Sequence, residues 1–286
     1  MILLTGANGR TGRAVLTALV ARGADVRAFV RNPQYAEDLL ELGAREVVIG
    51  DMATSEDVER GVVECAKVIH IGPPMSPDEV SMTMSFVAAA KRNAVDQFVY
   101  YSVMHPFRRE VRHHSLKLEA TERLVESGVP YTIIEPARYM QHLELIWSKV
   151  INAGDFAMPF DVDQKFNVVD LADLAEATAA IATESNHLYA TYELAGPQAL
   201  SQRDMAKVCA EILGRVVTAR EVALDDMARA AEARGINADR IEQMQIMNAH
   251  YTDHGFLGNP NILTWVLGRT PTTFRSYIER LVATTG

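Results

Sequence analysis

The sequence predicts a doubly wound α/β fold of the Rossmann type, in which helices cover both faces of a parallel sheet. Three observations predict it. Short apolar segments alternate with helical segments through the first half of the 286-residue chain. The apolar segments are hydrophobic almost throughout, which is the pattern of strands that are buried on both faces. A glycine-rich turn, TGANGRTG, follows the first of these segments and leads directly into a helical segment.

The expected elements follow one another with short joints, as repeated strand–helix–strand units require. We expect the strands at residues 2–7, 25–31, 46–51, 67–72, 97–102 and 131–136. We expect a helix after the first strand that ends near Gly23, and further helices at 35–43, 55–65, about 77–93 and around Lys117. Each helix would return the chain to the edge of the sheet from which the next strand starts.

After Pro136 the regular alternation of apolar and helical segments ends, and helical segments come to dominate. Residues 165–185 indicate a short strand and a helix, and residues 191–197 indicate one more strand. Ser201 and Gly214 are residue types that begin and end helices, so we expect a helix between them. The predicted core comprises 1–136 with later strands near 165–171 and 191–197, and a smaller, mainly helical region comprises 137–164 and 198–286.

Composition and charge exclude several classes of protein. The formal net charge of −9 argues against a general binder of nucleic acid or of anionic membranes. No apolar run in the sequence reaches the roughly 18–20 residues that span a bilayer. Cys65 and Cys209 lie far apart in the sequence, so we expect neither a disulfide framework nor a metal site. Two isolated cysteines favour a reducing compartment, and we therefore expect a cytoplasmic protein.

The glycine-rich turn has the spacing of a dinucleotide-binding site. Gly6 would permit the tight turn, Gly9 would let the backbone approach a pyrophosphate, and Gly12 would let the helix pack closely. The helix N-terminus would then offer unpaired N–H groups and the positive end of its dipole to the phosphates. A strand before the turn and a helix after it are the context that this motif requires. We expect the cofactor to contact Gly6, Asn8, Gly9, Arg10, Thr11 and Gly12.

The second expected strand ends at Arg31, a position that distinguishes the two nicotinamide dinucleotides. An NAD-preferring site has an acidic residue about 20 residues beyond the glycine turn, where it holds the ribose hydroxyls. The guanidinium of Arg31 would instead pair with a 2′-phosphate, which a carboxylate would repel. Arg10 would reach the same phosphate from the glycine turn. We therefore expect NADP(H) as the cofactor, the alternative being that both arginines are merely solvated.

Two later turns also face the expected cofactor. Asp51 and Met52 follow the third strand and are suited to flank an adenine, with a polar edge contact and an apolar face. Gly72, Pro73 and Pro74 follow the fourth strand, where a rigid backbone would lie along the cofactor. The alternative for both turns is ordinary loop structure.

Five segments of the chain together resemble the NmrA-like group of atypical short-chain dehydrogenases/reductases. They are TGANGRTG, VRAFVRNP, GDMAT, SGVPYTIIEP and YELAGPQALSQRDMAKVCAEILGR, and their order along nearly the whole chain is more specific than any one of them. The resemblance implies a Rossmann domain, a preference for NADP(H) and a smaller C-terminal region that forms a cleft. Some members of the group reduce quinones, aromatic ethers or carbonyls, and others bind the dinucleotide as redox sensors that regulate partner proteins.

The wider superfamily implies a catalytic pair with the spacing Tyr-x-x-x-Lys on one helix, in which the tyrosine donates a proton and the lysine holds the nicotinamide ribose. The corresponding segment here is HHSLK, with His113 in place of the tyrosine and Lys117 in place of the lysine. Residues four apart share one face of a helix. An imidazole titrates near neutrality, so His113 would donate the proton. The alternatives are a solvated His113 and a Lys117 that pairs on the surface with a neighbouring glutamate.

The remaining candidates follow the fifth and sixth strands, because ligands bind beyond the carboxyl ends of such strands. Ser102 and Pro136 end these strands and are expected to contact the cofactor. His105 is expected to contact the substrate. Tyr139 is a second candidate proton donor, and with Met140 it would line the substrate side of the site. Ordinary turn structure is the alternative for Ser102 and His105.

We therefore expect an NADP(H)-dependent oxidoreductase that transfers a hydride to a carbonyl, a quinone or a conjugated acceptor. The alternative is a non-catalytic NADP(H)-binding redox sensor, because the tyrosine of the catalytic pair is missing. A scaffold with a vestigial nucleotide pocket is a third option. We expect a small-molecule substrate and no direct nucleic-acid or membrane partner, and a homodimer is an open option for its assembly.

Overall fold

The computed structural model describes residues 1–285, and the chain divides into two compact units. The first unit comprises Met1–Arg109, His113–Pro136 and Leu174–Glu193. The second unit comprises Glu110–Arg112, Ala137–Asp173 and the chain from Leu194 onward. Both units are therefore discontinuous in sequence, because the chain leaves the first unit after Pro136 and returns to it at Leu174.

Seven strands form the sheet at the centre of the first unit: β1 (Ile2–Thr5), β2 (Val26–Val30), β3 (Glu46–Ile49), β4 (Lys67–His70), β5 (Gln97–Tyr101), β6 (Tyr131–Pro136) and β10 (Ala190–Leu194). Their order across the sheet is β10-β6-β5-β4-β1-β2-β3. Neighbouring strands from β3 to β6 pair in parallel, so that Leu3 of β1 lies between Arg27 of β2 and Val68 of β4. Strands β1, β2 and β5 are buried along their whole length, which explains why they are apolar apart from Thr5, Arg27 and Gln97. The predicted fold class is confirmed.

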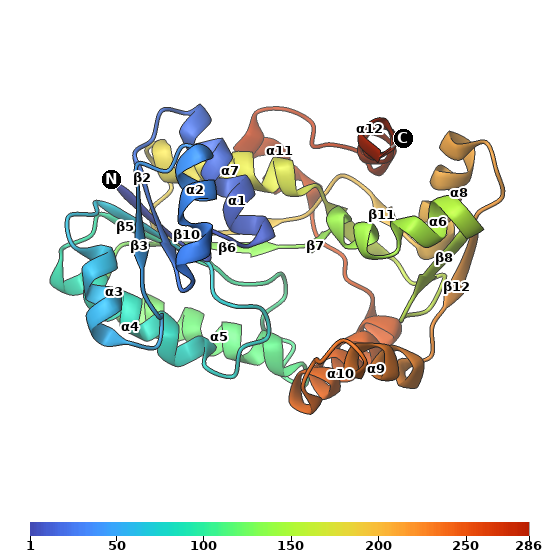
Figure 1. Ribbon diagram of the computed structural model, residues 1–286, viewed down its shortest axis with the longest axis horizontal. Coiled ribbons are helices and arrows are strands. Elements are labelled where there is room, and N and C mark those ends of the chain that lie inside the picture. Colours follow the sequence, from blue (N-terminus) through green and yellow to red (C-terminus); the bar gives the residue numbers. More distant parts are fainter. Residues whose placement is uncertain (286) are drawn as a thin grey trace. The chain divides into compact units, whose positions relative to one another are not determined.

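Helices cover both faces of this sheet: α1 (Arg10–Ala21), α2 (Ala36–Glu41), α3 (Ser55–Val62), α4 (Glu79–Arg92), α5 (Arg112–Glu126) and α7 (Leu171–Thr183), with a short 3-10 helix, η1 (Pro33–Tyr35), before α2. Figure 1 shows α1, α2 and α7 along one face and α3, α4 and α5 along the other. Phe29, Phe86 and Phe98 are fully buried in one hydrophobic cluster. The helices occupy the ranges that the sequence predicts for them, because each apolar strand is separated from the next by one amphipathic segment.

The second unit contains two small sheets and most of its chain is helical. Strands β7 (Arg138–Tyr139), β9 (Phe166–Val169) and β11 (Ala199–Leu200) form a sheet in the order β11-β9-β7, and β8 (Asp155–Met158) pairs with β12 (Thr218–Glu221). The helices are η2 (Met140–Leu145), α6 (Trp147–Ala153), α8 (Gln202–Leu213), α9 (Leu224–Glu232), α10 (Ala238–His254), α11 (Pro260–Leu267) and α12 (Phe274–Thr285). None of the helices in residues 1–285 combines the length and apolar character needed to cross a membrane.

The strand expected near 165–171 does not belong to the sheet of the first unit, so this part of the domain prediction is wrong. Strand β9 pairs with β7 and β11 instead. The reason is a close approach of two backbones: a Cβ on Gly196 would lie 1.8 Å from the carbonyl oxygen of Val168. The side chain of Asn167 also donates a hydrogen bond of 2.9 Å to the Gly196 carbonyl and accepts one of 3.0 Å from the Gly258 N–H. These contacts tie β9 to the second unit.

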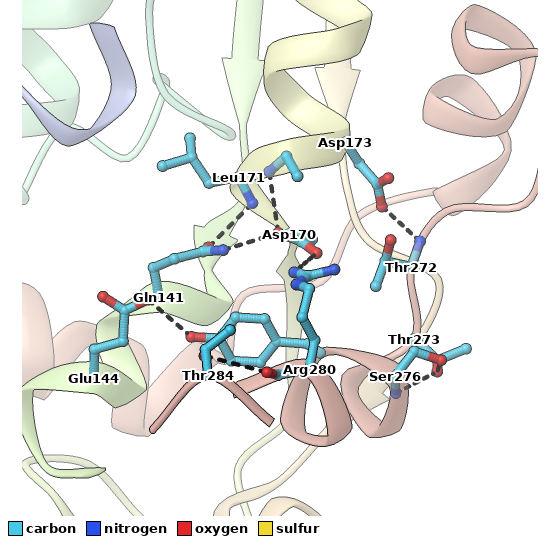
Figure 2. A network of polar contacts seen from close by, with 12 residues as sticks. Gln141, Glu144, Asp170, Leu171, Asp173, Thr272, Thr273, Ser276, Arg280 and Thr284 are labelled. Carbon is cyan, nitrogen blue, oxygen red and sulfur yellow. Dashed lines mark hydrogen bonds and ion pairs between the residues drawn. The ribbon is translucent and has the colours of Figure 1, made fainter. Parts of the chain in front are cut away.

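A buried carboxylate joins three parts of the second unit (Figure 2). Asp170 is fully buried, and its Oδ1 accepts hydrogen bonds of 2.8 Å from Gln141 Nε2 and 3.0 Å from the Ala172 N–H. Its Oδ2 pairs with the guanidinium of Arg280 on α12. Gln141 Oε1 in turn accepts a hydrogen bond of 3.0 Å from the Leu171 N–H. The first turn of α7 and helices η2 and α12 are therefore linked by paired polar groups rather than by apolar packing alone.

Helix α8 begins and ends at the predicted residues. The Ser201 hydroxyl accepts a hydrogen bond of 3.2 Å from the Asp204 N–H, and the Asp204 carboxylate accepts one of 3.0 Å from the Ser201 N–H. This reciprocal arrangement is a capping box. Gly214 ends the helix in the left-handed conformation, with φ of 62°. The local capping signals in the sequence thus sufficed to predict both ends.

Candidate functional site

Two of the three glycines in the first turn are required by the fold itself. Gly6 has φ of +61°, and a Cβ there would lie 2.7 Å from the Ile71 carbonyl oxygen. A Cβ on Gly12 would lie 2.2 Å from the Gly6 carbonyl oxygen and 2.7 Å from Ala7 Cα. A side chain at Gly6 would therefore press against the backbone that follows β4, and one at Gly12 would push α1 away from the turn that follows β1.

Gly9 differs, because its conformation does not require glycine and a Cβ there would make one tight contact rather than a clash. It is the N-cap residue of α1 with an extended backbone, φ −74° and ψ 166°. A Cβ there would meet only the Gly6 carbonyl oxygen, at 3.3 Å, and the residue is exposed. The first turn of α1 carries no acidic residue. The exposed backbone of Gly9 lies beside a helix N-terminus and has no side chain over it. It therefore suits a phosphate and fits the pyrophosphate of a dinucleotide. Arg10 is also exposed, and Asn8 and Thr11 are partly buried.

Arg31 follows β2 directly and its side chain is exposed. The next residue, Asn32, caps η1 by accepting a hydrogen bond of 3.0 Å from the Gln34 N–H, which holds the backbone beside Arg31. Within residues 1–285 no hydrogen bond or ion pair engages the Arg31 guanidinium. A held backbone and an unengaged cation match what the 2′-phosphate of NADP(H) requires.

The later turns of the first unit have structural roles of their own. Asp51 Oδ1 accepts a hydrogen bond of 2.9 Å from the Ala53 N–H, which fixes the turn after β3. Met52 packs against the buried hydrophobic cluster. A Cβ on Gly72 would lie 2.9 Å from Glu79 Oε2, and the Pro73 and Pro74 that follow it are exposed. The assignment of Asp51, Met52 and these three residues to the cofactor stays a prediction.

Lys117 lies in a buried ion pair rather than on the surface. Its Nζ donates hydrogen bonds of 2.7 Å to Glu79 Oε1 and 2.7 Å to the Tyr101 carbonyl. The hydroxyl of Tyr100 donates a further 2.7 Å bond to the same Glu79 oxygen. Lys117 is 6% exposed and Glu79 is 2% exposed. Burial alone would raise the pKa of Glu79, but the charge and hydrogen bond of Lys117 lower it, so Glu79 stays ionised.

The sequence reasoning missed Glu79. Its only signal in the sequence is that of an acidic residue in the first turn of a helix, which is common and has no functional meaning by itself. Only the tertiary fold brings α4 and α5 together so that Glu79 meets Lys117.

Polar atoms without partners gather at the carboxyl ends of β4 and β5. Within residues 1–285, His70 Nε2, Glu79 Oε2 and Ser102 Oγ are buried and have no hydrogen-bond partner. The other ring nitrogen of His70 lies 3.2 Å from the hydroxyl of Thr5, at the end of β1. Unpaired buried polar atoms are costly and therefore rare. Their presence at the edge where α/β proteins bind ligands favours a functional site there.

His113 is half-buried and does not titrate near neutrality, so that expectation is wrong. Burial, and then the nearby charge of Lys117, lower the pKa of His113 to about 4. The neighbouring His114 is fully buried; its Nδ1 lies 2.9 Å from the His105 carbonyl oxygen, and burial lowers its pKa to about 3. At neutral pH His113 therefore offers a neutral imidazole rather than an imidazolium. Its role as a proton donor remains a prediction.

His105 lies in a cluster of ionisable groups at the end of β6 and β10. It adopts the left-handed conformation, with φ of 56°, and its Nε2 lies 3.3 Å from Glu193 Oε2. Its Nδ1 faces the guanidinium of Arg108 at 3.3 Å. Burial, together with the charge of Glu193, raises the pKa of Glu135 to about 7. Strain at a non-glycine residue and a carboxyl group that titrates near neutrality both favour a functional location.

The other predicted residues at this point of the sequence are divided between the units. The Pro136 carbonyl accepts a hydrogen bond of 3.1 Å from the Met104 N–H in the first unit. Tyr139 and Met140 belong to the second unit. The ring of Tyr139 stacks on that of His142 with 5.6 Å between the centroids, and both residues line a small pocket with Met140.

These shifts predict how stability depends on pH. His70 and His113 have pKa values of about 4 and His114 of about 3, against an ordinary value of 6.5, so below pH 6.5 the unfolded chain binds protons that the folded chain does not. Glu135, with its pKa raised to about 7, acts in the opposite direction between about pH 4.5 and 7. From these four groups, the free energy of unfolding should fall with a net slope of about two protons as the pH drops from 6.5 towards 4.5, and His105 and His187, whose pKa values burial also lowers, add to this slope.

Urea unfolding at a series of pH values measures this slope. His113→Phe should make it shallower by about one proton, and Glu135→Gln should make it steeper by about one. A slope that neither variant changes would contradict the assigned shifts.

The sequence matches a known family over almost its whole length. Residues 1–279 match the model of the NmrA-like family. The chain is 25% identical to the NAD(P)H azoreductase of Xenophilus azovorans, over 100% of this chain and 99% of that protein. It is also 25% identical to quinone oxidoreductase 2 of Escherichia coli (strain K12), over 98% of each chain.

Solved structures match the fold over the same length. The NADPH-dependent quinone oxidoreductase of Escherichia coli, complexed with NADPH, superposes with a TM-score of 0.87 at 23% identity and covers 99% of this chain and 100% of its own. The triphenylmethane reductase of Citrobacter sp. gives a TM-score of 0.86 at 21% identity, covering 99% of both chains. Both units of this chain therefore have the fold of these proteins.

Proposed function

Because this chain belongs to the NmrA-like family, as its sequence motifs indicated, we propose that it is an NADPH-dependent reductase of a small carbonyl, quinone or conjugated acceptor. The observation that carries the proposal is the exposed backbone at Gly9. This glycine is extended, in a conformation that does not require glycine, and it lies at the N-terminus of a helix without acidic residues in its first turn. Two relatives of full-length similarity are named as NAD(P)H azoreductase and quinone oxidoreductase 2, which supports the same chemistry.

Different residues of the first unit would bind different parts of the cofactor. The backbone at Gly9 and the start of α1 bind the pyrophosphate, and Arg31 pairs with the 2′-phosphate. Lys117, oriented by Glu79 and the Tyr101 carbonyl, holds the nicotinamide ribose. When bound, NADPH supplies a hydride, and the acceptor takes up one proton in addition, so that NADP⁺ and the reduced acceptor are released.

His113 would act as a hydrogen-bond donor to the acceptor oxygen. With its pKa at about 4 it is neutral at pH 7, so one ring N–H is available to hydrogen-bond the acceptor oxygen, and the proton that the acceptor takes up comes from solvent. Tyr139 is the second candidate for this position.

The test of the proposed function is oxidation of NADPH in the presence of quinones, aldehydes and enones. We expect turnover with at least one class, and a loss of about 100-fold or more in kcat for His113→Phe with an unchanged affinity for NADPH. His254→Phe, on the exposed end of α10, is the matched control. Full activity of His113→Phe would move the donor to Tyr139 or to solvent. Tight NADPH binding without turnover on the whole panel would contradict the reductase and favour the sensor.

One observation favours the sensor as the second candidate. The ammonium group of Lys117 is already bonded to Glu79 and to the Tyr101 carbonyl, and no tyrosine stands four residues before it. A protein that binds NADP(H) without turnover would need no free proton donor in this helix.

Arg31 should determine the preference between the two dinucleotides. Arg31→Asp should weaken NADPH binding by roughly 1.5–3 kcal/mol, or about tenfold to a hundredfold, because a charge-assisted phosphate contact is lost. The affinity for NADH should change little. Calorimetric titration of both dinucleotides measures the ratio, with Arg31→Lys expected to retain part of the preference. Arg234→Asp, at an exposed position of the second unit, controls for net charge. An unchanged ratio would transfer the role to Arg10.

A further inference from the structure

The arginine that opens β7 lies against aromatic rings. The guanidinium carbon of Arg138 lies 4.7 Å from the ring centroid of Phe160 and 6.0 Å from that of Phe166, and both phenylalanines are fully buried. Among the described residues 1–285, the guanidinium makes one hydrogen bond, from Nη2 to the sulfur of Met158 at 3.7 Å. A thioether is a weak acceptor, so most of the hydrogen-bonding capacity of this group is unused.

No carboxylate neutralises this charge within residues 1–285 of the structure. Burial lowers the pKa of Arg138 to about 10, which leaves it charged at every physiological pH. Other arginines of the same unit have acidic partners: Arg269 lies 2.7 Å from Asp173 Oδ1, and Arg280 pairs with Asp170. A half-buried cation without an anion is costly, and this cost favours a role for Arg138 beyond stability.

Arg138 also lines a pocket. The pocket lies wholly in the second unit, and its other walls include Tyr139, His142, Met158, Met205 and Phe274. The pocket is small, so it suits an end group of a ligand rather than a ring system. Within its described lining, Arg138 is the one group that carries a full charge at neutral pH irrespective of its surroundings. A guanidinium presents its donors in a fixed fork that fits the paired oxygens of an oxyanion.

We propose that this pocket binds an anionic oxygen group on the acceptor, a carboxylate or another oxyacid group, with Arg138 as the residue that selects it. The term acceptor rests on the proposed function, but the binding itself does not depend on turnover. Arg138 would thus be a specificity-determining residue, and the aromatic rings of Phe160 and Phe166 would hold its guanidinium in place when no ligand is bound.

The test is calorimetric binding of two ligands that differ only in charge, anthraquinone-2-carboxylate and anthraquinone-2-carboxamide, to the full-length protein saturated with NADP⁺. The wild type should bind the carboxylate at least about tenfold more tightly than the carboxamide. Arg138→Met should remove this preference by weakening the carboxylate, with the affinity for the carboxamide kept within about threefold. Arg138→Lys should keep part of the preference. Arg234→Met, at an exposed position of the same unit, should behave like the wild type.

Two results would overturn the proposal: equal affinities for both ligands in the wild type, or an undiminished preference in Arg138→Met. If Arg138→Met does not fold, the wild type and Arg138→Lys still test the proposal, because comparing the affinities of the two ligands for the wild type needs no variant. The proposal and the reductase assignment fail separately. A strong carboxylate preference without any NADPH oxidation refutes only the reductase, and turnover without a preference refutes only the role of Arg138.

Discussion

Gly9→Val should weaken NADPH binding by more than about 100-fold, or ~2.7 kcal/mol, while the protein remains folded. The extended conformation of Gly9 is open to valine, and a Cβ there meets only one carbonyl oxygen, at 3.3 Å. A branched side chain would nevertheless occupy the space in which the pyrophosphate approaches the backbone. Calorimetric titration with NADPH measures the loss, and thermal unfolding shows whether the fold is kept.

Two matched variants make this result specific. Gly9→Ala should lose less affinity, because its side chain is smaller, and Thr17→Val on the exposed face of α1 should lose none. Gly12→Ala should instead unfold or distort the turn, since its Cβ would lie 2.2 Å from the Gly6 carbonyl oxygen. A folded Gly9→Val with the affinity of the wild type would remove the pyrophosphate from this turn.

Lys117→Met should cost about 3–5 kcal/mol of unfolding free energy, the second large effect that we expect. The substitution leaves the carboxylate of Glu79, which is 2% exposed, without its cation, and its remaining side-chain donors are the Tyr100 hydroxyl at 2.7 Å and the Thr83 hydroxyl at 3.5 Å. Urea unfolding of the variant measures the cost. The double variant Lys117→Met with Glu79→Gln should recover most of it, because no buried charge is then left unpaired and the amide oxygen still accepts from Tyr100.

The double variant also separates the structural role of Lys117 from its role at the cofactor. If Lys117 holds the nicotinamide ribose, the double variant should have near-normal stability but weakened NADPH binding and turnover. If instead both NADPH affinity and turnover return with stability, Lys117 serves the fold alone, and its assignment to the cofactor is wrong.

The fold of the first unit could be predicted from the sequence because each of its elements has a local cause. Val26–Val30 is apolar apart from Arg27 and buried along its whole length, and the glycines of the first turn mark the start of α1. The second unit follows less clear patterns. The strand Phe166–Val169 is as fully buried as a central strand, so its composition does not reveal which sheet it joins. Contacts with Gly196 and Gly258, distant in sequence, decide that.

Some residues of the candidate site could likewise be predicted from the sequence, and others could not. Gly9 and Arg31 could be proposed from the sequence because the roles expected of them depend on backbone conformation and on position after a strand. Glu79, Glu135 and Arg138 could not, since the neighbours that make each of them unusual come together only in the tertiary structure. His113 shows the converse: its residue type suggested titration near neutrality, but burial lowers its pKa to about 4.

The discontinuity of the first unit bears on how the chain folds during its synthesis. Once Pro136 has left the ribosome, six strands of the central sheet are available, but the edge strand β10 and the residues of α7 that belong to this unit come only after Ala137–Asp173. Until Glu193 has been made, β6 remains an open sheet edge with unpaired backbone groups, a ready template for another chain. A nascent chain therefore passes through an aggregation-prone interval, and truncation at the apparent end of the nucleotide-binding core would make that interval permanent.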